Sequence, residues 1–343
     1  MVEHFFTYID IENFKSIKKL RIDGCKRINL FIGPPNVGKS NILEALSLFS
    51  LPYFRFQTPK RLDNFIRVNY LAELFSEGNN YETIKVNTNQ IILETKYDKN
   101  GGFLDLKIKE NVDSGKLLDH VKSDNKLWLR NGSVLSNSKY KPFVKRYLFN
   151  LKTKYSESYL DFLIPPFGNN LSNCIELNND LNYEIKTLLK DYNLEAVYDR
   201  ASSSIKFQKK IKNDEILQLA YNLIADTLQR YLFHLTAIKS NENSILLFEE
   251  PEANCFPPYI SAFANDMMKT KNNQFFVATH SPFIVNELLE NTKDDNELAI
   301  YIVHWKDNQT QVKLLSNEEM NEVYQYGVDL FFNGDIFLMD EKS

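Results

Sequence analysis

A segment near the N-terminus has the residue types and the spacing of a phosphate-binding loop. Residues 33–40 read GPPNVGKS, which fits the pattern G-x-x-x-x-G-K-[S/T] at every fixed position. The two glycines let the backbone curl until successive N–H groups face an anion, and the start of a helix adds a favourable dipole for phosphate. The segment therefore predicts a binding site for ATP.

The side chains of this loop predict how the nucleotide is held. Lys39 is expected to reach the β- and γ-phosphates during catalysis, and Ser40 is expected to ligate Mg²⁺. Asn36 can touch the γ-phosphate from the loop. A chance match in an unrelated turn is the alternative, but an apolar strand precedes the segment and a helix follows it. The candidate nucleotide-binding residues here are Gly33, Pro34, Asn36, Val37, Gly38, Lys39, Ser40 and Asn41.

Two consecutive acids follow an apolar run far along the chain. Residues 244–250 read SILLFEE, which is typical of a buried strand that ends in Glu249 and Glu250. Glu249 is expected in the magnesium shell, and Glu250 is expected to polarise the attacking water as a general base. The first acid at such a site is usually Asp, so the longer Glu249 side chain predicts a displaced metal or a water-mediated contact. A solvated acidic strand end is the alternative.

A histidine ends a further buried strand. Residues 274–280 read QFFVATH, and His280 lies thirty residues after Glu250. A histidine at this position can hydrogen-bond the γ-phosphate or the attacking water, and can thereby sense hydrolysis. The alternative is a purely structural histidine.

The hydrophobic pattern predicts the elements that position these residues. A buried strand at 27–32 leads into the loop, and apolar residues at helical spacing follow from Ser40. Turn residues 99–102 and 131–132 indicate two hairpins. Further strands are expected at 4–12, 18–23, 82–109, 126–135, 194–199, 203–210, 298–304 and 310–315, and further helices at 60–76, 141–163, 179–192, 225–238, 258–269, 282–290 and 317–325.

Composition narrows the class of protein. The 343 residues suggest two domains, or one large domain with an insertion. The net charge of −4 argues against a strongly basic nucleic-acid-binding protein, and the three widely separated cysteines lack zinc spacing. The N-terminus lacks a signal-peptide pattern and no long apolar run is present, so a cytoplasmic protein without membrane contact is expected.

Four segments together resemble the ABC-type, SMC-like ATPases of the prokaryotic AAA group, which contains RecF, the overcoming-lysogenization-defect (OLD) proteins and the ATPase of Septu anti-phage systems. They read IENFKSIKKLRI, GPPNVGKSNILEAL, LLFEEPEANCFPP and FFVATHSPFIV. The resemblance implies an α/β P-loop NTPase of ABC-ATPase type, with a mixed sheet flanked by helices and an inserted α+β region. The expected ranges are 1–60 and 201–343 for the ATPase core and 61–200 for the insertion.

The resemblance also implies that ATP lies between two protomers. Asn254 then falls in the dimer-contacting loop. A Ser-Gly-type signature should face the partner's nucleotide, but residues 225–230 read ADTLQR, without glycine and with Ala225 where a hydroxyl is expected. Thr227 and the helix N-terminus remain candidates for this contact. The alternative is that the helix only packs in the core.

Three functions stay open. The first is an ATPase subunit of a defence system, acting as a homodimer or higher oligomer and controlling a separately encoded effector such as a nuclease. The second is a RecF-like ATPase that binds DNA, and the third is a nucleotide-gated scaffold with little hydrolysis. Asp335 and Asp340 alone cannot form a two-metal nuclease site, and the tail is expected to be a plain strand. Basic residues that could contact DNA or RNA, or simply form a solvated face, are Lys15, Lys18, Lys19, Arg21, Lys26 and Arg27, and Lys206, Lys209, Lys210 and Lys212.

Overall fold

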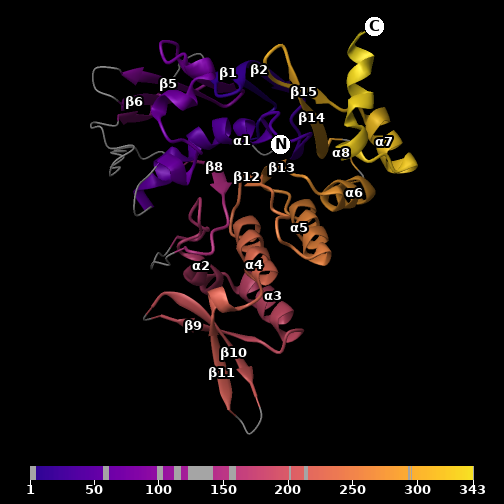
Figure 1. The fold of residues 1–343 in the computed structure, drawn as a ribbon. Helices are drawn as coiled ribbons and strands as arrows, with labels where there is room; N and C mark the ends of the chain where they lie inside the picture. The colour runs from indigo at the N-terminus through magenta and orange to yellow at the C-terminus, as the bar shows by residue number, and fades with distance from the viewer. Residues whose placement is uncertain are drawn as a thin grey trace. The chain divides into compact units, whose positions relative to one another are not determined.

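The computed structural model divides the chain into two compact units (Figure 1). Unit 1 comprises residues 1–146, 243–250 and 271–343, and unit 2 comprises residues 147–242 and 251–270. The structure describes residues 5–56, 62–98, 103–111, 117–122, 142–153, 160–200, 202–211, 215–292, 294 and 296–342.

Unit 1 contains a mixed six-stranded sheet in the order β15-β14-β3-β13-β12-β8. The central strands β14, β3, β13 and β12 are parallel, and β15 runs antiparallel to β14. Their near-continuous apolar sequences fit this arrangement, because parallel strands are covered on both faces. The strands are β3 (Ile28–Ile32), β8 (Val144–Tyr147), β12 (Ile245–Glu249), β13 (Gln274–Ala278), β14 (Leu298–Lys306) and β15 (Gln309–Leu314).

A second six-stranded sheet of unit 1 is antiparallel, in the order β2-β1-β4-β5-β6-β7. Alternate residues of β1, β4 and β5 are buried, as expected when one face of a sheet is covered. Helix α1 (Lys39–Ser47) contacts β1 of this sheet and β12 and β13 of the mixed sheet. The strands are β1 (Tyr8–Phe14), β2 (Ile17–Asp23), β4 (Ile84–Thr88), β5 (Ile91–Asp98), β6 (Phe103–Glu110) and β7 (Leu117–Lys122).

The remaining elements of unit 1 are helical. Short 3₁₀ segments η1 to η4 follow α1, and helices α6 to α8 with segment η7 lie in the C-terminal part. Their bounds are η1 (Leu48–Phe56), η2 (Leu62–Asn64), η3 (Leu71–Leu74), η4 (Ser76–Gly78), α6 (Pro282–Asn291), α7 (Asn317–Tyr326), α8 (Leu330–Asn333) and η7 (Gly334–Lys342).

Unit 2 combines helices with a three-stranded antiparallel sheet in the order β11-β10-β9. Helix α4 packs against α5, and α3 contacts both α4 and β9 (Figure 1). Its elements are α2 (Leu171–Leu177), α3 (Asn179–Lys190), β9 (Glu195–Asp199), β10 (Ser204–Lys210), β11 (Ile216–Ala220), η6 (Tyr221–Leu223), α4 (Asp226–Lys239) and α5 (Pro257–Lys269).

Three predicted elements were wrong. Residues 60–76 do not form one helix; the described part folds into 3₁₀ turns that still bury Leu62 and Leu74. The segment 141–163 includes strand β8, because its backbone joins β12 at the sheet edge, where the Ile245 N–H donates to the Phe143 carbonyl. The tail is helical rather than a strand, since the Asp329 side chain accepts from the Phe331 N–H and starts α8.

The units do not divide at residues 60 and 200, because β4 pairs with β1 and extends the N-terminal sheet beyond residue 60. The division into core and insertion stays a prediction. The turn at 99–102 and the hairpin at 126–135 lie outside the described residues. Among the residues that are described, no helix is long and apolar enough to cross a membrane.

Candidate nucleotide site

The phosphate loop joins the end of β3 to the start of α1, and its two glycines are required by geometry. Gly33 has a φ of 145°, and a Cβ there would lie 2.2 Å from the Val303 carbonyl oxygen. Gly38 has a φ of 102°, and a Cβ there would lie 2.0 Å from Oγ1 of Thr310. Any other residue would therefore be strained and would collide with β14 or β15.

Hydrogen bonds of polar side chains hold the phosphate loop in place. The Thr310 hydroxyl donates to the Val37 carbonyl at 2.8 Å and lies 2.7 Å from the Ser16 hydroxyl. The Asn41 side chain donates to Ser16 Oγ at 2.6 Å. Val37 and Asn41 therefore help to hold the loop in place, while Pro34 and Asn36 are exposed at its tip, where a phosphate could reach them.

Lys39 is held inside the loop. Its Nζ donates to the carbonyls of Gly33 and Pro34, both at 2.7 Å, and the residue is only 6% exposed. Burial lowers the pKa of Lys39, and this effect is opposed by Glu250 and Glu249. A positive side chain is thus pre-positioned in the loop expected to receive phosphate.

Glu249 ends β12 among positive groups. Its Oε2 is paired with Arg146, its Oε1 lies 3.2 Å from Nη2 of Arg67, and the Ser40 hydroxyl donates to the carboxylate. Burial alone would raise the pKa of Glu249, but Arg146, Ser40 and Arg67 hold it below its ordinary value. The two predicted metal ligands, Ser40 and Glu249, are therefore neighbours.

A buried carboxylate that the sequence analysis did not identify lies beside them. Glu44 on α1 is fully buried and is ion-paired with Lys15 and with Arg67, whose Nε lies 2.8 Å from Glu44 Oε1. Arg146 Nη2 lies 3.9 Å from the same oxygen. A detectable signal was that Glu44 follows Ser40 by four residues and so shares its helix face. We call Lys15, Glu44, Arg67, Arg146 and Glu249 the carboxylate–cation cluster.

Glu250 and His280 face each other at the ends of adjacent parallel strands. His280 Nε2 lies 3.7 Å from Glu250 Oε1, and both side chains are about half exposed. The Glu250 N–H donates to the Ala278 carbonyl at 2.8 Å, and the backbone φ of Glu250 is 45°. Burial lowers the pKa of His280, Lys39 lowers it further, and Glu250 opposes both, so the neutral imidazole is favoured.

The donors at this site fit magnesium in part. Among the described residues, no group of three or more His, Cys, Asp or Glu side chains could hold a metal. The Ser40 hydroxyl and the Glu249 carboxylate are the hard oxygen donors that Mg²⁺ prefers, and Mg²⁺ usually combines few protein ligands with waters and substrate phosphates. Because arginines contact both Glu249 oxygens, a metal at this carboxylate would compete with them.

The residues predicted to face a partner's nucleotide come together within unit 2. The Thr227 hydroxyl donates to the Asn254 carbonyl at 3.1 Å. Helix α4 begins after Ala225, which supplies no side-chain cap, and Arg230 pairs with Asp226 at 3.0 Å. The hydroxyl of Thr227 is thus engaged with the loop that carries Asn254.

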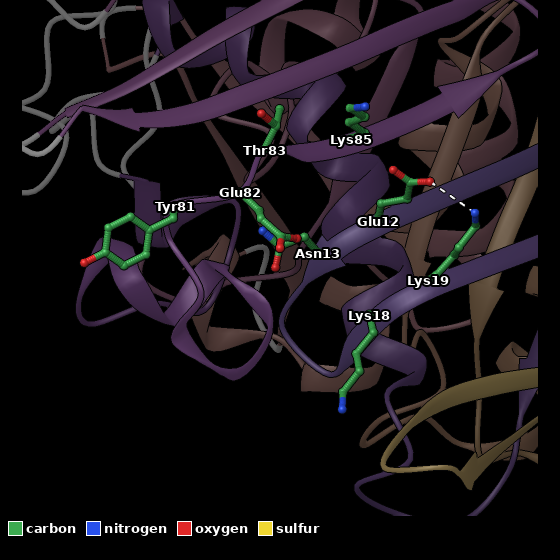
Figure 2. A pocket seen from close by; sticks show the side chains of 8 residues that line it. All are labelled: Glu12, Asn13, Lys18, Lys19, Tyr81, Glu82, Thr83 and Lys85. Carbon is green, nitrogen blue, oxygen red and sulfur yellow. Dashed lines mark ion pairs between the residues drawn. The ribbon is translucent and has the colours of Figure 1, made fainter.

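Acidic side chains pair with most of the cations in the first basic segment, residues 15–27. Lys18 pairs with Glu77, Arg21 with Asp10 and Asp23, and Arg27 with Glu297, while Lys15 belongs to the carboxylate–cation cluster. A hollow of about 530 Å³ lies nearby. Among the side chains that line it, Lys19 points toward Glu12 (Figure 2). Its lining includes three lysines and two glutamates, so its charges largely cancel. In the second segment, Lys206 pairs with Asp199, and Lys212 lies outside the described residues.

Comparison with known families is decisive for the class of protein. Residues 28–286 match the family described as "AAA domain, putative AbiEii toxin, Type IV TA system". The chain belongs to this family. It is therefore an AAA-family P-loop ATPase domain, and the match spans the phosphate loop, the paired acids and His280.

Solved structures identify the fold. A crystal structure of an SMC head bound to the C-winged helix domain of ScpA aligns over 92% of this chain and 99% of that chain, with a TM-score of 0.52 and 15% identity. An SMC head with an extended coiled coil, bound to the C-terminal domain of ScpA derived from Pyrococcus furiosus, aligns over 94% and 99%, with a TM-score of 0.51 and 13% identity. The predicted α/β fold of ABC-ATPase type, a mixed sheet flanked by helices, is confirmed.

Sequence relatives match over shorter stretches. Protein ea59 of Escherichia phage lambda is 32% identical over 93 residues, covering 24% of this chain and 18% of that protein. An ATP/GTP phosphatase of Helicobacter pylori is 50% identical over 38 residues, which cover 11% of this chain and 10% of that protein. An uncharacterized protein of Methanocaldococcus jannaschii is 28% identical over 129 residues, which cover 35% of this chain and 55% of that protein. The matches thus span less than two thirds of each relative's length.

Proposed function

We propose that this protein binds and hydrolyses ATP with Mg²⁺ as an ABC-type ATPase subunit. One observation carries the proposal: the ends of β3, β12 and β13 bring Lys39, Glu250 and His280 to one place, with Ser40 and Glu249 beside them. Parallel strands present their carboxyl ends at one edge of a sheet, where α/β proteins bind ligands.

Each residue then has a defined task. The N–H groups of the loop and Lys39 would bind the β- and γ-phosphates. Ser40 and Glu249 would hold Mg²⁺, and a bound Mg²⁺ would supply positive charge to the phosphates. Glu250 accepts the proton of the attacking water. Neutral His280, 3.7 Å from Glu250, orients that water or the γ-phosphate through Nε2.

The variant Glu250→Gln tests this assignment. It keeps the size of the side chain but removes its basicity, so ATP binding should persist while turnover falls roughly 10²–10⁴-fold. Phosphate release measures turnover, and equilibrium titration with ATP measures binding. Glu290→Gln, an exposed change on α6, is the matched control and should leave both unchanged. Equal turnover in Glu250→Gln and the wild type would remove the role of Glu250.

A nucleotide-gated scaffold with little hydrolysis is the second candidate. It is favoured by the arginine partners on both Glu249 oxygens, because a carboxylate already neutralised is a weaker metal ligand. ATP binding by the wild type without measurable phosphate release would support this candidate, and steady turnover would exclude it.

For the cellular role, we propose control of a separately encoded effector in an anti-phage system of the RecF, OLD and Septu group. The description of the family as a putative toxin of a toxin–antitoxin system agrees with this role. Co-purification of the chain with the product of a neighbouring gene, tested with and without ATP, would identify the effector. Recovery of duplex DNA instead of a protein partner would favour the RecF-like alternative.

A further inference from the structure

Two arginines contact Glu249, and they are held very differently. Arg146 is 2% exposed, donates to the Phe65 carbonyl as well as to Glu249, and lies beside Glu44. It is therefore a fixed part of the buried structure.

Arg67 is held loosely by comparison. Its side chain is 66% exposed, and its Nη2 reaches Glu249 Oε1 at 3.2 Å. Its Nε and its backbone N–H both contact Glu44 Oε1, at 2.8 and 3.2 Å. The end of the guanidinium can therefore leave Glu249 for solvent while the backbone of Arg67 remains attached to Glu44.

We propose that Arg67 is a displaceable internal counter-ion. It pairs with the Glu249 carboxylate in the nucleotide-free protein and competes with Mg²⁺ for that carboxylate. This inference rests on the proposed function, since it assigns Glu249 to the metal. Arg67 is a positioning residue rather than a catalytic one, because it acts through Glu249.

The charges of the carboxylate–cation cluster explain the competition. Three cations surround two carboxylates, so a divalent metal at Glu249 must enter a region that already has excess positive charge. Removal of Arg67 leaves one cation for each remaining acid. Glu44 then keeps Lys15 and the nearby Arg146, so the change leaves no buried carboxylate without a partner.

The test measures how Mg²⁺ supports binding of adenylyl imidodiphosphate, a non-hydrolysable ATP analogue. Arg67→Gln should lower the Mg²⁺ concentration for half-maximal binding by roughly two- to fivefold, the size expected for one exposed ion pair. Binding in EDTA should be unchanged or weaker, because a positive charge is lost. Arg67→Lys keeps the charge and should stay near the wild type. Arg21→Gln, which removes an exposed arginine paired with Asp10 and Asp23, is the matched control and should change neither value.

Three results would overturn the inference: a higher Mg²⁺ requirement in Arg67→Gln, an equal loss of binding with and without Mg²⁺, or the same shift in Arg21→Gln. A separate readout is the rise in the thermal midpoint caused by MgCl₂ alone, which should be larger in Arg67→Gln than in the wild type. If the wild type binds no nucleotide, the proposed function fails, and the MgCl₂ readout still decides whether Arg67 competes with the metal.

Discussion

Single backbone positions decide whether the phosphate loop can form. Gly38 combines a φ of 102° with a space too small for a Cβ, since Thr310 and Ser16 fill it. The two hydroxyls also contact each other, and Thr310 contacts Val37, so a side chain at position 38 would disturb the support of the whole loop.

Gly38→Ala should therefore weaken ATP binding at least about tenfold, because strain of roughly 1–3 kcal/mol at this φ adds to a steric collision. Equilibrium titration with ATP measures the effect. Gly327→Ala is the control, since Gly327 has a positive φ of 62° but a Cβ added there would have no atom within 4 Å. Normal ATP binding by Gly38→Ala would contradict the loop geometry.

At the level of elements, the contact between α4 and α5 contains an ionisable group that opposes folding near pH 7. Asp266 on α5 is 4% exposed, and the Tyr231 hydroxyl of α4 lies 3.1 Å from its Oδ2. Burial raises the pKa of Asp266 to about 6 from an ordinary 3.8, with Lys239 lowering it and Glu184 raising it. The folded protein thus holds this proton more tightly than the unfolded chain does.

The sign of the pH dependence follows from this shift. A carboxyl whose pKa is raised on folding stabilises the protein most below pH 3.8, and that contribution is lost as the pH rises through about 6. Asp266→Asn should therefore match the wild type near pH 4 and exceed it near pH 7, by at most about 3 kcal/mol. Thermal midpoints across this range measure the difference. Asp161→Asn, a change at an exposed position, should leave the pH dependence of the thermal midpoint as in the wild type. If Asp266→Asn differs from the wild type by the same amount at every pH, the raised pKa of Asp266 is contradicted.

At the scale of the whole molecule, the proposal that ATP lies between two protomers predicts that a second chain contributes to the site. Lys39, Glu250 and His280 come together in unit 1, whereas the residues expected to face a partner's nucleotide, Thr227 and Asn254, meet in unit 2. Because Ala225 replaces the expected hydroxyl, we expect nucleotide-dependent dimers to be weak.

The variant Glu250→Gln should reveal these nucleotide-dependent dimers, because it retains ATP instead of hydrolysing it. Light scattering should show a mass near 40.1 kDa without nucleotide and an increase toward twice that value with ATP and Mg²⁺ at high protein concentration. Gly38→Ala, which should bind ATP at least about tenfold more weakly, serves as the negative control at an ATP concentration that only the intact loop can use. A mass that is insensitive to ATP would contradict nucleotide-dependent assembly.

The sequence was most informative where function depends on neighbouring residues. The loop at 33–40, the acids that end β12 and the histidine that follows β13 could all be found from local spacing, because strand ends and glycine turns depend on nearby residues. Strand β8 could not be found in this way. Its four residues become a strand through pairing with β12, about a hundred positions later.

The sequence by itself therefore determined the class of fold and the residues expected to meet ATP, because phosphate binding needs a short, contiguous pattern. Only the tertiary structure decided the electrostatic setting of Glu249. Arg67 reaches it from the loop between η2 and η3, Arg146 reaches it from edge strand β8, and Glu44 joins them from α1. Charges so far apart in the chain affect one another only when folding places them a few ångströms apart, since water screens them strongly in the unfolded chain.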